Sequence, residues 1–108
     1  LLGVGAKAVL YQWAVGDRTV PNATTAALLR AGRLEAVSSL YRHDQGVAGL
    51  SDRFKNPHGF LVWTLFPEVH AIGRAAQEQV ARFFVVAGRQ IEQVLTQFEI
   101  GAALPPGP

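Results

Sequence analysis

The chain has 108 residues, of which 49% are hydrophobic and only 17% charged, and its net charge is +2. This length supports one domain, and this composition excludes an intrinsically disordered protein. The chain contains no cysteine, which excludes disulfides, thiolate zinc sites, iron–sulfur clusters and cysteine nucleophiles. It also contains no methionine and begins at Leu1, so we expect a processed product or part of a longer protein.

The first expected element is a helix over residues 1–16. Val9, Leu10, Trp13 and Ala14 follow a helical spacing, and the glycine at position 16 is suited to a C-terminal cap. This segment is too short and too charged to predict a membrane span, which needs about 20 apolar residues.

A second helix is expected over residues 22–43, because apolar residues recur there at helical spacing. Asn22 or one of the threonines after it could cap the start of this helix. Gly32 could divide the segment into two short helices, but we favour one continuous helix.

Residues 43–59 form the most polar part of the chain. Ser51 is placed to cap a short helical turn that carries Phe54. The sequence Asn56-Pro57-His58-Gly59 predicts a tight turn, because proline fixes φ and glycine adopts left-handed geometry.

The apolar segment Phe60–Phe66 is compatible with a strand or a helix, but no other segment offers an obvious strand partner. We therefore expect a short buried helix that restarts at Pro67. From Pro67 to Phe98 apolar residues keep helical spacing, which predicts one long helix that Gly101 could cap.

The predicted fold class is all-α: a three- to four-helix bundle with one long C-terminal helix, in a single domain 1–101 with a flexible tail 102–108.

The sequence indicates no catalytic site. The three histidines lack metal-binding spacing, although His43 and His58 flank the polar region with Asp44 and Asp52 and could converge there. Serine residues are present, but no G-x-S-x-G nucleophile motif or phosphate-binding glycine loop accompanies them. We interpret the histidines as surface or turn residues, and we expect neither enzymatic activity nor a bound metal or cofactor.

The most informative feature is the amount of apolar surface on the predicted long helix. Four successive apolar residues at 83–86 span about 300° of a helix, so one neighbouring face cannot cover them. We therefore predict a non-catalytic subunit or assembly protein that packs against copies of itself or a larger complex. The predicted interface residues are Phe60, Trp63, Phe66, Phe83, Phe84, Val85 and Val86, with Val85 or Val86 covered by another chain or a lipid surface.

Two alternatives stay open. A small helical nucleic-acid-binding protein would use an arginine-rich face, but nearby acidic residues dilute that face. Its residues would be Arg30, Arg33, Arg42, Arg53 and Lys55. The other alternative is a membrane-edge subunit without a transmembrane helix, which docks through residues 1–15 and Phe60–Phe66. The sequence does not indicate a cellular compartment.

Overall fold

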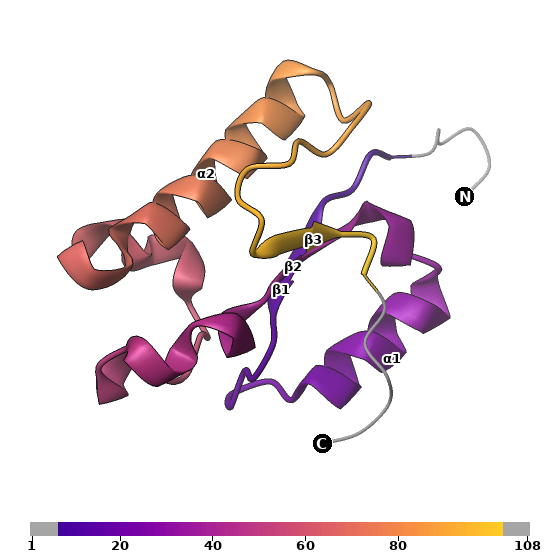
Figure 1. Cartoon of the computed structure of the whole chain (residues 1–108). Helices are drawn as coiled ribbons and strands as arrows, with labels where there is room; N and C mark the ends of the chain where they lie inside the picture. The colour runs from indigo at the N-terminus through magenta and orange to yellow at the C-terminus, as the bar shows by residue number, and fades with distance from the viewer. Residues whose placement is uncertain (1–6, 103–108) are drawn as a thin grey trace.

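A computed structural model describes residues 7–102 and shows a small mixed α/β fold, so the prediction of an all-α helical bundle is wrong. Its centre is a three-stranded sheet in the order β1-β2-β3 (Figure 1). The strands are β1 (Tyr11–Ala14), β2 (Ser38–Tyr41) and β3 (Phe98–Ile100). β1 runs parallel to β2, and β3 runs antiparallel to β2.

In residues 7–16, β1 lies where a helix was predicted, and the rest of that predicted helix, residues 1–6, lies outside the described residues. Trp13 and Ala14 are both buried, and they belong to two different apolar clusters. Both faces of the strand are therefore covered, so the neighbours Trp13 and Ala14 are both apolar and the strand shows no clear polar–apolar alternation. Such a short apolar run fits helical spacing equally well, which explains the wrong prediction.

The expected second helix ends much earlier than predicted. α1 (Asn22–Gly32) stops where Arg33 adopts a left-handed conformation, and the Arg33 N–H donates to the carbonyls of the last turn. Asn22 begins this helix, but its side chain makes no capping bond. A 3₁₀ turn at Glu35–Val37 leads into β2, the central strand, whose four residues are all buried. Backbone pairing on both sides of β2 outweighs the helical spacing of its side chains.

The turn at Asn56–Gly59 is confirmed: Gly59 has a φ of 83°, and the Phe60 N–H donates to the Pro57 carbonyl at 3.0 Å. The expected turn that carries Phe54 is also present, as the 3₁₀ helix Asp52–Phe54. Ser51 precedes it without capping it, because the Ser51 hydroxyl donates instead to Glu68 Oε1 at 2.9 Å.

The segment Phe60–Phe66 was predicted to be a short buried helix that restarts at Pro67. It forms 3₁₀ turns over Phe60–Leu65 and restarts over Pro67–Val69, but it is only partly buried, because Val62 and Leu65 are 57% and 78% exposed. α2 (His70–Val85) follows and packs closely on the first of these turns. Gly73 allows this approach, because a Cβ at this position would lie 2.6 Å from the Thr64 backbone nitrogen.

The predicted long helix to Phe98 is also wrong, because α2 ends at Val85. Ala87 and Gly88 have φ values of 54° and 73°, which turn the chain out of the helix. The chain then returns along the core to β3, and Gly101 follows this strand rather than capping a helix. Of the predicted tail, only position 102 lies within the described residues.

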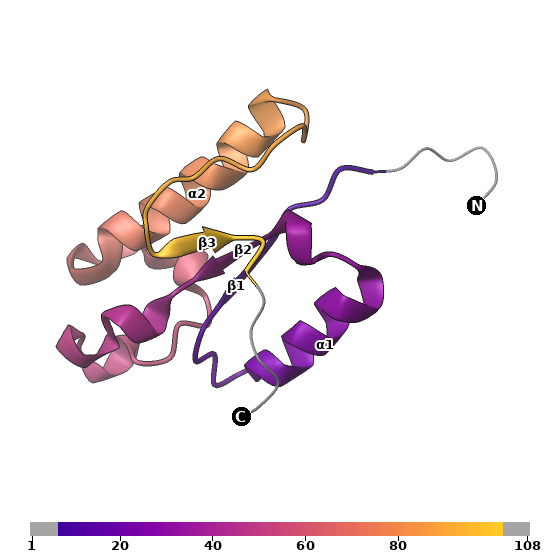
Figure 2. The ribbon, with the colours of Figure 1, turned by 45° about the vertical axis from the view of Figure 1, so that its right-hand side comes forward.

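The two helices cover opposite faces of the sheet (Figures 1 and 2). On the α1 side, the buried cluster consists of Trp13, Ala26, Leu29 and Leu40. On the α2 side, a larger aromatic cluster consists of Ala14, Tyr41, Phe54, Phe60, Trp63, Val69, Ala75, Ala76 and Phe98. Because both faces of the sheet are covered, β1 and β2 are held in place. The loop after β1 therefore starts from a well-packed part of the fold.

Candidate functional site

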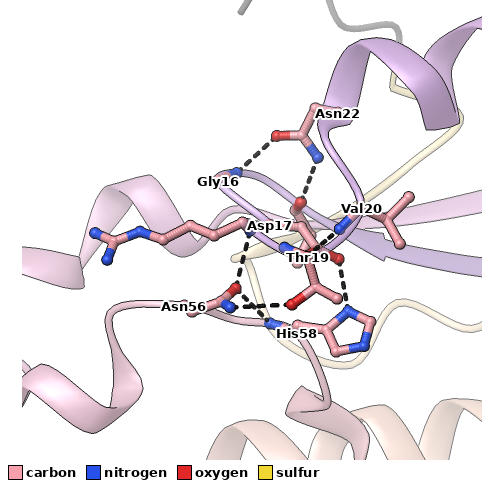
Figure 3. A network of polar contacts seen from close by, with 9 residues as sticks. Gly16, Asp17, Thr19, Val20, Asn22, Asn56 and His58 are labelled. Carbon is pink, nitrogen blue, oxygen red and sulfur yellow. Dashed lines mark hydrogen bonds and ion pairs between the residues drawn. The ribbon is translucent and has the colours of Figure 1, made fainter.

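A carboxylate and an imidazole meet beside the carboxyl end of β1 (Figure 3). Asp17 lies in the loop between β1 and α1, and its Oδ2 is 3.1 Å from Nδ1 of His58. Asp17 Oδ1 accepts hydrogen bonds from the N–H groups of Thr19 at 2.8 Å and Val20 at 2.9 Å. Aspartate favours this arrangement, because its short side chain reaches the backbone two residues further on. We call Asp17 and His58 the dyad.

The environment of Asp17 favours its ionised form. Burial alone would raise the pKa of this carboxyl, whose side chain is only 17% exposed. Hydrogen bonds from Val20, His58 and Thr19 outweigh that effect and hold the pKa below its ordinary value. Asp17 is therefore a fixed negative charge at neutral pH.

His58 is positioned by the turn at residues 56–59. Asn56 Oδ1 accepts from the His58 N–H at 3.2 Å and from the Arg18 N–H at 2.9 Å. Asn56 Nδ2 donates to Thr19 Oγ1 at 3.2 Å. One asparagine thus joins the turn that carries His58 to the loop that carries Asp17, and Figure 3 shows both loops held in this network.

The hydrogen bond to Asp17 also fixes the proton on the imidazole. A carboxylate only accepts, so Nδ1 of the neutral ring carries the hydrogen and Nε2 carries a lone pair. Nε2 of His58 has no hydrogen-bond partner among residues 7–102, and the side chain is 50% exposed. The ring can therefore accept a proton at Nε2, or it can coordinate a metal there.

The other two histidines do not join the dyad. His43 is buried in the aromatic cluster, where it lies between the Tyr41 hydroxyl at 3.1 Å and the Lys55 carbonyl at 3.2 Å. The ring of His70 bonds the Thr64 carbonyl through Nδ1. His43 and His58 therefore bind different partners. His43 lies in a 3₁₀ turn, in agreement with the interpretation of the histidines as surface or turn residues, but it is buried rather than on the surface. The described residues contain no group of three or more metal-ligating side chains.

The predicted interface residues divide into three groups by burial. Phe60, Trp63 and Phe83 are buried in the core of this chain. Phe66 and Val86 are partly buried. By contrast, Phe84 and Val85 at the end of α2 are 74% and 83% exposed. The described fold therefore leaves the last turn of α2 uncovered on one side.

The predicted basic residues do not form one uniform face. Arg42 makes ion pairs with Asp44 and Glu99, both at 2.7 Å. Arg53 lies over the rings of two phenylalanines, 4.8 Å and 5.0 Å from their centres. Arg30 lies in the last turn of α1 with Arg33 next to it, and both are exposed. Lys55 is half-buried, and its carbonyl bonds the buried imidazole of the core.

The dyad lines neither of two hollows in the described part of the chain. One has a volume of about 220 Å³ between the end of β2 and residues 96–97. The other, of about 360 Å³, lies beside β1 and the C-terminal half of α2. The His58 side chain of the dyad is nevertheless accessible, because it is 50% exposed.

The sequence contained one signal for the dyad. The acidic residue Asp17 follows closely after a short apolar run, and a strand there would place it at a site-forming end of a sheet. Because we read that run as a helix, Asp17 received no role. Its contact with His58 spans 41 residues, and no local pattern predicts it.

Searches against protein-family models, curated proteins and solved structures find no match for this chain. Among the residues that the structure describes, no helix is both long and apolar enough to span a membrane.

Proposed function

We propose that Asp17 and His58 are the acid–base half of a hydrolytic site for an ester or amide substrate. One observation carries this proposal: an ionised, largely buried carboxylate binds Nδ1 of an imidazole whose Nε2 has no partner among residues 7–102. In Ser-His-Asp hydrolases the aspartate and histidine have this relation, and the aspartate fixes the tautomer of the base.

The position of the dyad supports the proposal. In open α/β sheets, ligands bind outside the carboxyl ends of parallel strands. Asp17 follows the carboxyl end of β1, which pairs in parallel with β2. The bonds that Asn56 makes to both loops hold the two side chains in place before any substrate arrives, as a catalytic base requires.

The proposed reaction needs one more group, a nucleophilic hydroxyl. No hydroxyl among residues 7–102 is hydrogen-bonded to Nε2 of His58. The nucleophile is therefore water or a hydroxyl from outside these residues. Nε2 takes the proton of that hydroxyl or water as its oxygen attacks the substrate carbonyl, and returns the proton to the departing alcohol or amine. Where the nucleophile is a hydroxyl, water then attacks the acyl ester through the same proton transfers, which releases the acid and restores the hydroxyl. Asp17 stays ionised and stabilises the imidazolium.

A comparison of two histidine variants tests the proposal. His58→Gln removes the base, and His70→Gln is the matched control, because His70 is also exposed and also bonded through Nδ1, but to a carbonyl. We expect His58→Gln to lower the rate of p-nitrophenyl acetate hydrolysis on the order of 100-fold, and His70→Gln to leave it unchanged. If both variants hydrolyse p-nitrophenyl acetate at the same rate, and circular dichroism shows that both are folded, the proposal is contradicted.

A second function is favoured by a different observation. Phe84 and Val85 are 74% and 83% exposed, which is unusual for neighbouring large apolar residues. We propose that this end of α2 packs against a copy of the chain or against a larger complex, as the sequence predicted. Light scattering should then show an assembly that Val85→Glu dissociates without loss of fold. A stable monomer would contradict packing against a copy of the chain. Packing against a larger complex, like the nucleic-acid and membrane-edge alternatives, stays a prediction.

A further inference from the structure

Among the described residues, both outer strands of the sheet have a neighbour on one side only, and one of these two open edges is that of β1. β2 lies between β1 and β3, so β1 has a neighbour on one side only. The Val15 N–H donates to the Tyr41 carbonyl, and backbone groups alternate in direction along a strand. The backbone N–H and C=O of Gln12 and the N–H of Ala14 therefore point away from β2, toward the open edge. Such an edge is a template for another strand.

The side chain of Asn22 already occupies the last position on this edge. Its Nδ2 donates to the Ala14 carbonyl at 2.6 Å, and its Oδ1 accepts from the Gly16 N–H at 2.7 Å (Figure 3). In a parallel ladder, one residue of the neighbouring strand binds a carbonyl at position i and an N–H at position i+2. The Asn22 amide reproduces that pattern, so it stands where a residue of a parallel strand would stand.

The surface beside this edge is apolar. A hollow of about 360 Å³ lies between the start of β1 and the end of α2. It is lined by Ala8, Val9, Leu10, Gln12, Val80, Phe83 and Phe84. None of these residues is charged, whereas natural free edges are commonly protected by charge, proline or a covering element. An occupant of this edge would place aliphatic side chains into the hollow.

We propose that the free edge of β1 receives an additional parallel β-strand, with aliphatic side chains facing α2, which ends against Asn22. One residue of the added strand pairs with the Gln12 N–H, and a later one pairs with the Gln12 carbonyl and the Ala14 N–H. The Asn22 amide already occupies the next pairing position, at the Ala14 carbonyl and the Gly16 N–H. A strand that runs parallel to β1 leaves the sheet at the end where Asp17 and His58 lie. In this respect the inference rests on the proposed function: the residues after that strand are placed to bring the missing hydroxyl to Nε2.

Backbone amide exchange with a strand-forming peptide tests this inference. The probe is acetyl-Lys-Val-Thr-Val-Ile-Lys-amide, with control peptides N-methylated at either set of alternate residues. We expect the probe to slow exchange of the Gln12 and Ala14 amides roughly tenfold when nine in ten molecules are bound. A nitroxide at the C-terminal end of the peptide should broaden the Gly16 amide, and one at the N-terminal end should broaden Ala8. At least one N-methylated control should lose this protection.

Two variants locate the binding surface. Phe84→Glu places a charge in the hollow and should weaken peptide binding about tenfold, the effect of one lost apolar contact. Leu65→Glu is the matched control, because Leu65 is 78% exposed against 74% for Phe84 but does not line the hollow, and it should bind the peptide normally.

Failure to bind at millimolar peptide, protection at β3 instead, or the opposite pattern of nitroxide broadening would each overturn the inference. The outcome is separable from that of the proposed function. If the peptide binds but His58→Gln leaves hydrolysis unchanged, only the proposed function fails. If His58→Gln abolishes hydrolysis but no peptide binds, only the added strand is wrong.

Discussion

Asp17→Asn tests the central feature of the candidate site, because it keeps the shape of the side chain and changes one contact. The amide oxygen still accepts from the N–H groups of Thr19 and Val20, so the NH₂ group faces Nδ1 of His58. An NH₂ group only donates, and it cannot bond an Nδ1 that also carries hydrogen. The ring proton should therefore move to Nε2, which removes the lone pair that accepts a proton from the nucleophile.

The cost to stability follows from the same contact. A hydrogen bond to a charged group contributes about 1.5–3 kcal/mol. The His58 side chain is 50% exposed, so solvent screens part of this contribution, and we expect a loss of about 1 kcal/mol in the free energy of unfolding. The effect on hydrolysis should be larger, on the order of 100-fold, because the wrong tautomer cannot act as the base.

Long-range ¹H–¹⁵N correlation spectra at pH 8 report the tautomer of each histidine ring, and urea unfolding reports stability. In the Asp17→Asn variant, the His58 ring should change to the Nε2–H form while the His70 ring stays unchanged. If the His58 ring keeps its hydrogen on Nδ1, or if the rate of hydrolysis is unaffected, then Asp17 does not orient the base and our reasoning is refuted.

Three further predictions concern the fold around the site. Gly73→Ala should lower the free energy of unfolding by about 1–3 kcal/mol in urea titrations, because the new Cβ meets the Thr64 nitrogen at 2.6 Å; an unchanged midpoint would show that α2 can move aside. Asn22→Ala should cost about 1–2 kcal/mol, since it leaves the Ala14 carbonyl and the Gly16 N–H unpaired, and a loss below about 0.5 kcal/mol would argue against its role at the edge. Burial lowers the pKa of His43, so the unfolded chain binds a proton that the folded chain excludes. Stability should therefore be complete above the unfolded pKa of about 6.5 and should fall by up to about 1.4 kcal/mol per pH unit below it, and His43→Gln should abolish this slope.

Several local features were predictable from the sequence because the residues that cause them are neighbours. The turn at Asn56–Gly59 forms where proline and glycine set the backbone angles. The helical restart at Pro67 forms where proline suits a first helical turn. The start of α1 at Asn22 also agrees with expectation, although Asn22 bonds backward to the end of β1 instead of capping the helix.

The three strands could not be predicted in the same way. Each has only three or four residues, and each is stabilised by backbone bonds to segments distant in the chain. The side chains of β2 continued the helical spacing of α1, and those before β3 continued that of α2. Spacing alone therefore extended both helices too far. The two helices end at Gly32 and Val85, where left-handed residues follow. These residues end the helices because the chain after them can pair as a strand in the sheet.

The sequence by itself determined that the chain has enough apolar residues for a core. It also determined the tight turns and the start of each helix. These features depend on composition and on contacts within a few residues. Only the tertiary structure decided that β1 and β2 lie side by side, and that Asp17 meets His58 across 41 residues. The physical reason is that strand pairing and the dyad gain their stability from hydrogen bonds between distant segments. Those bonds exist only where the tertiary fold brings the distant segments together.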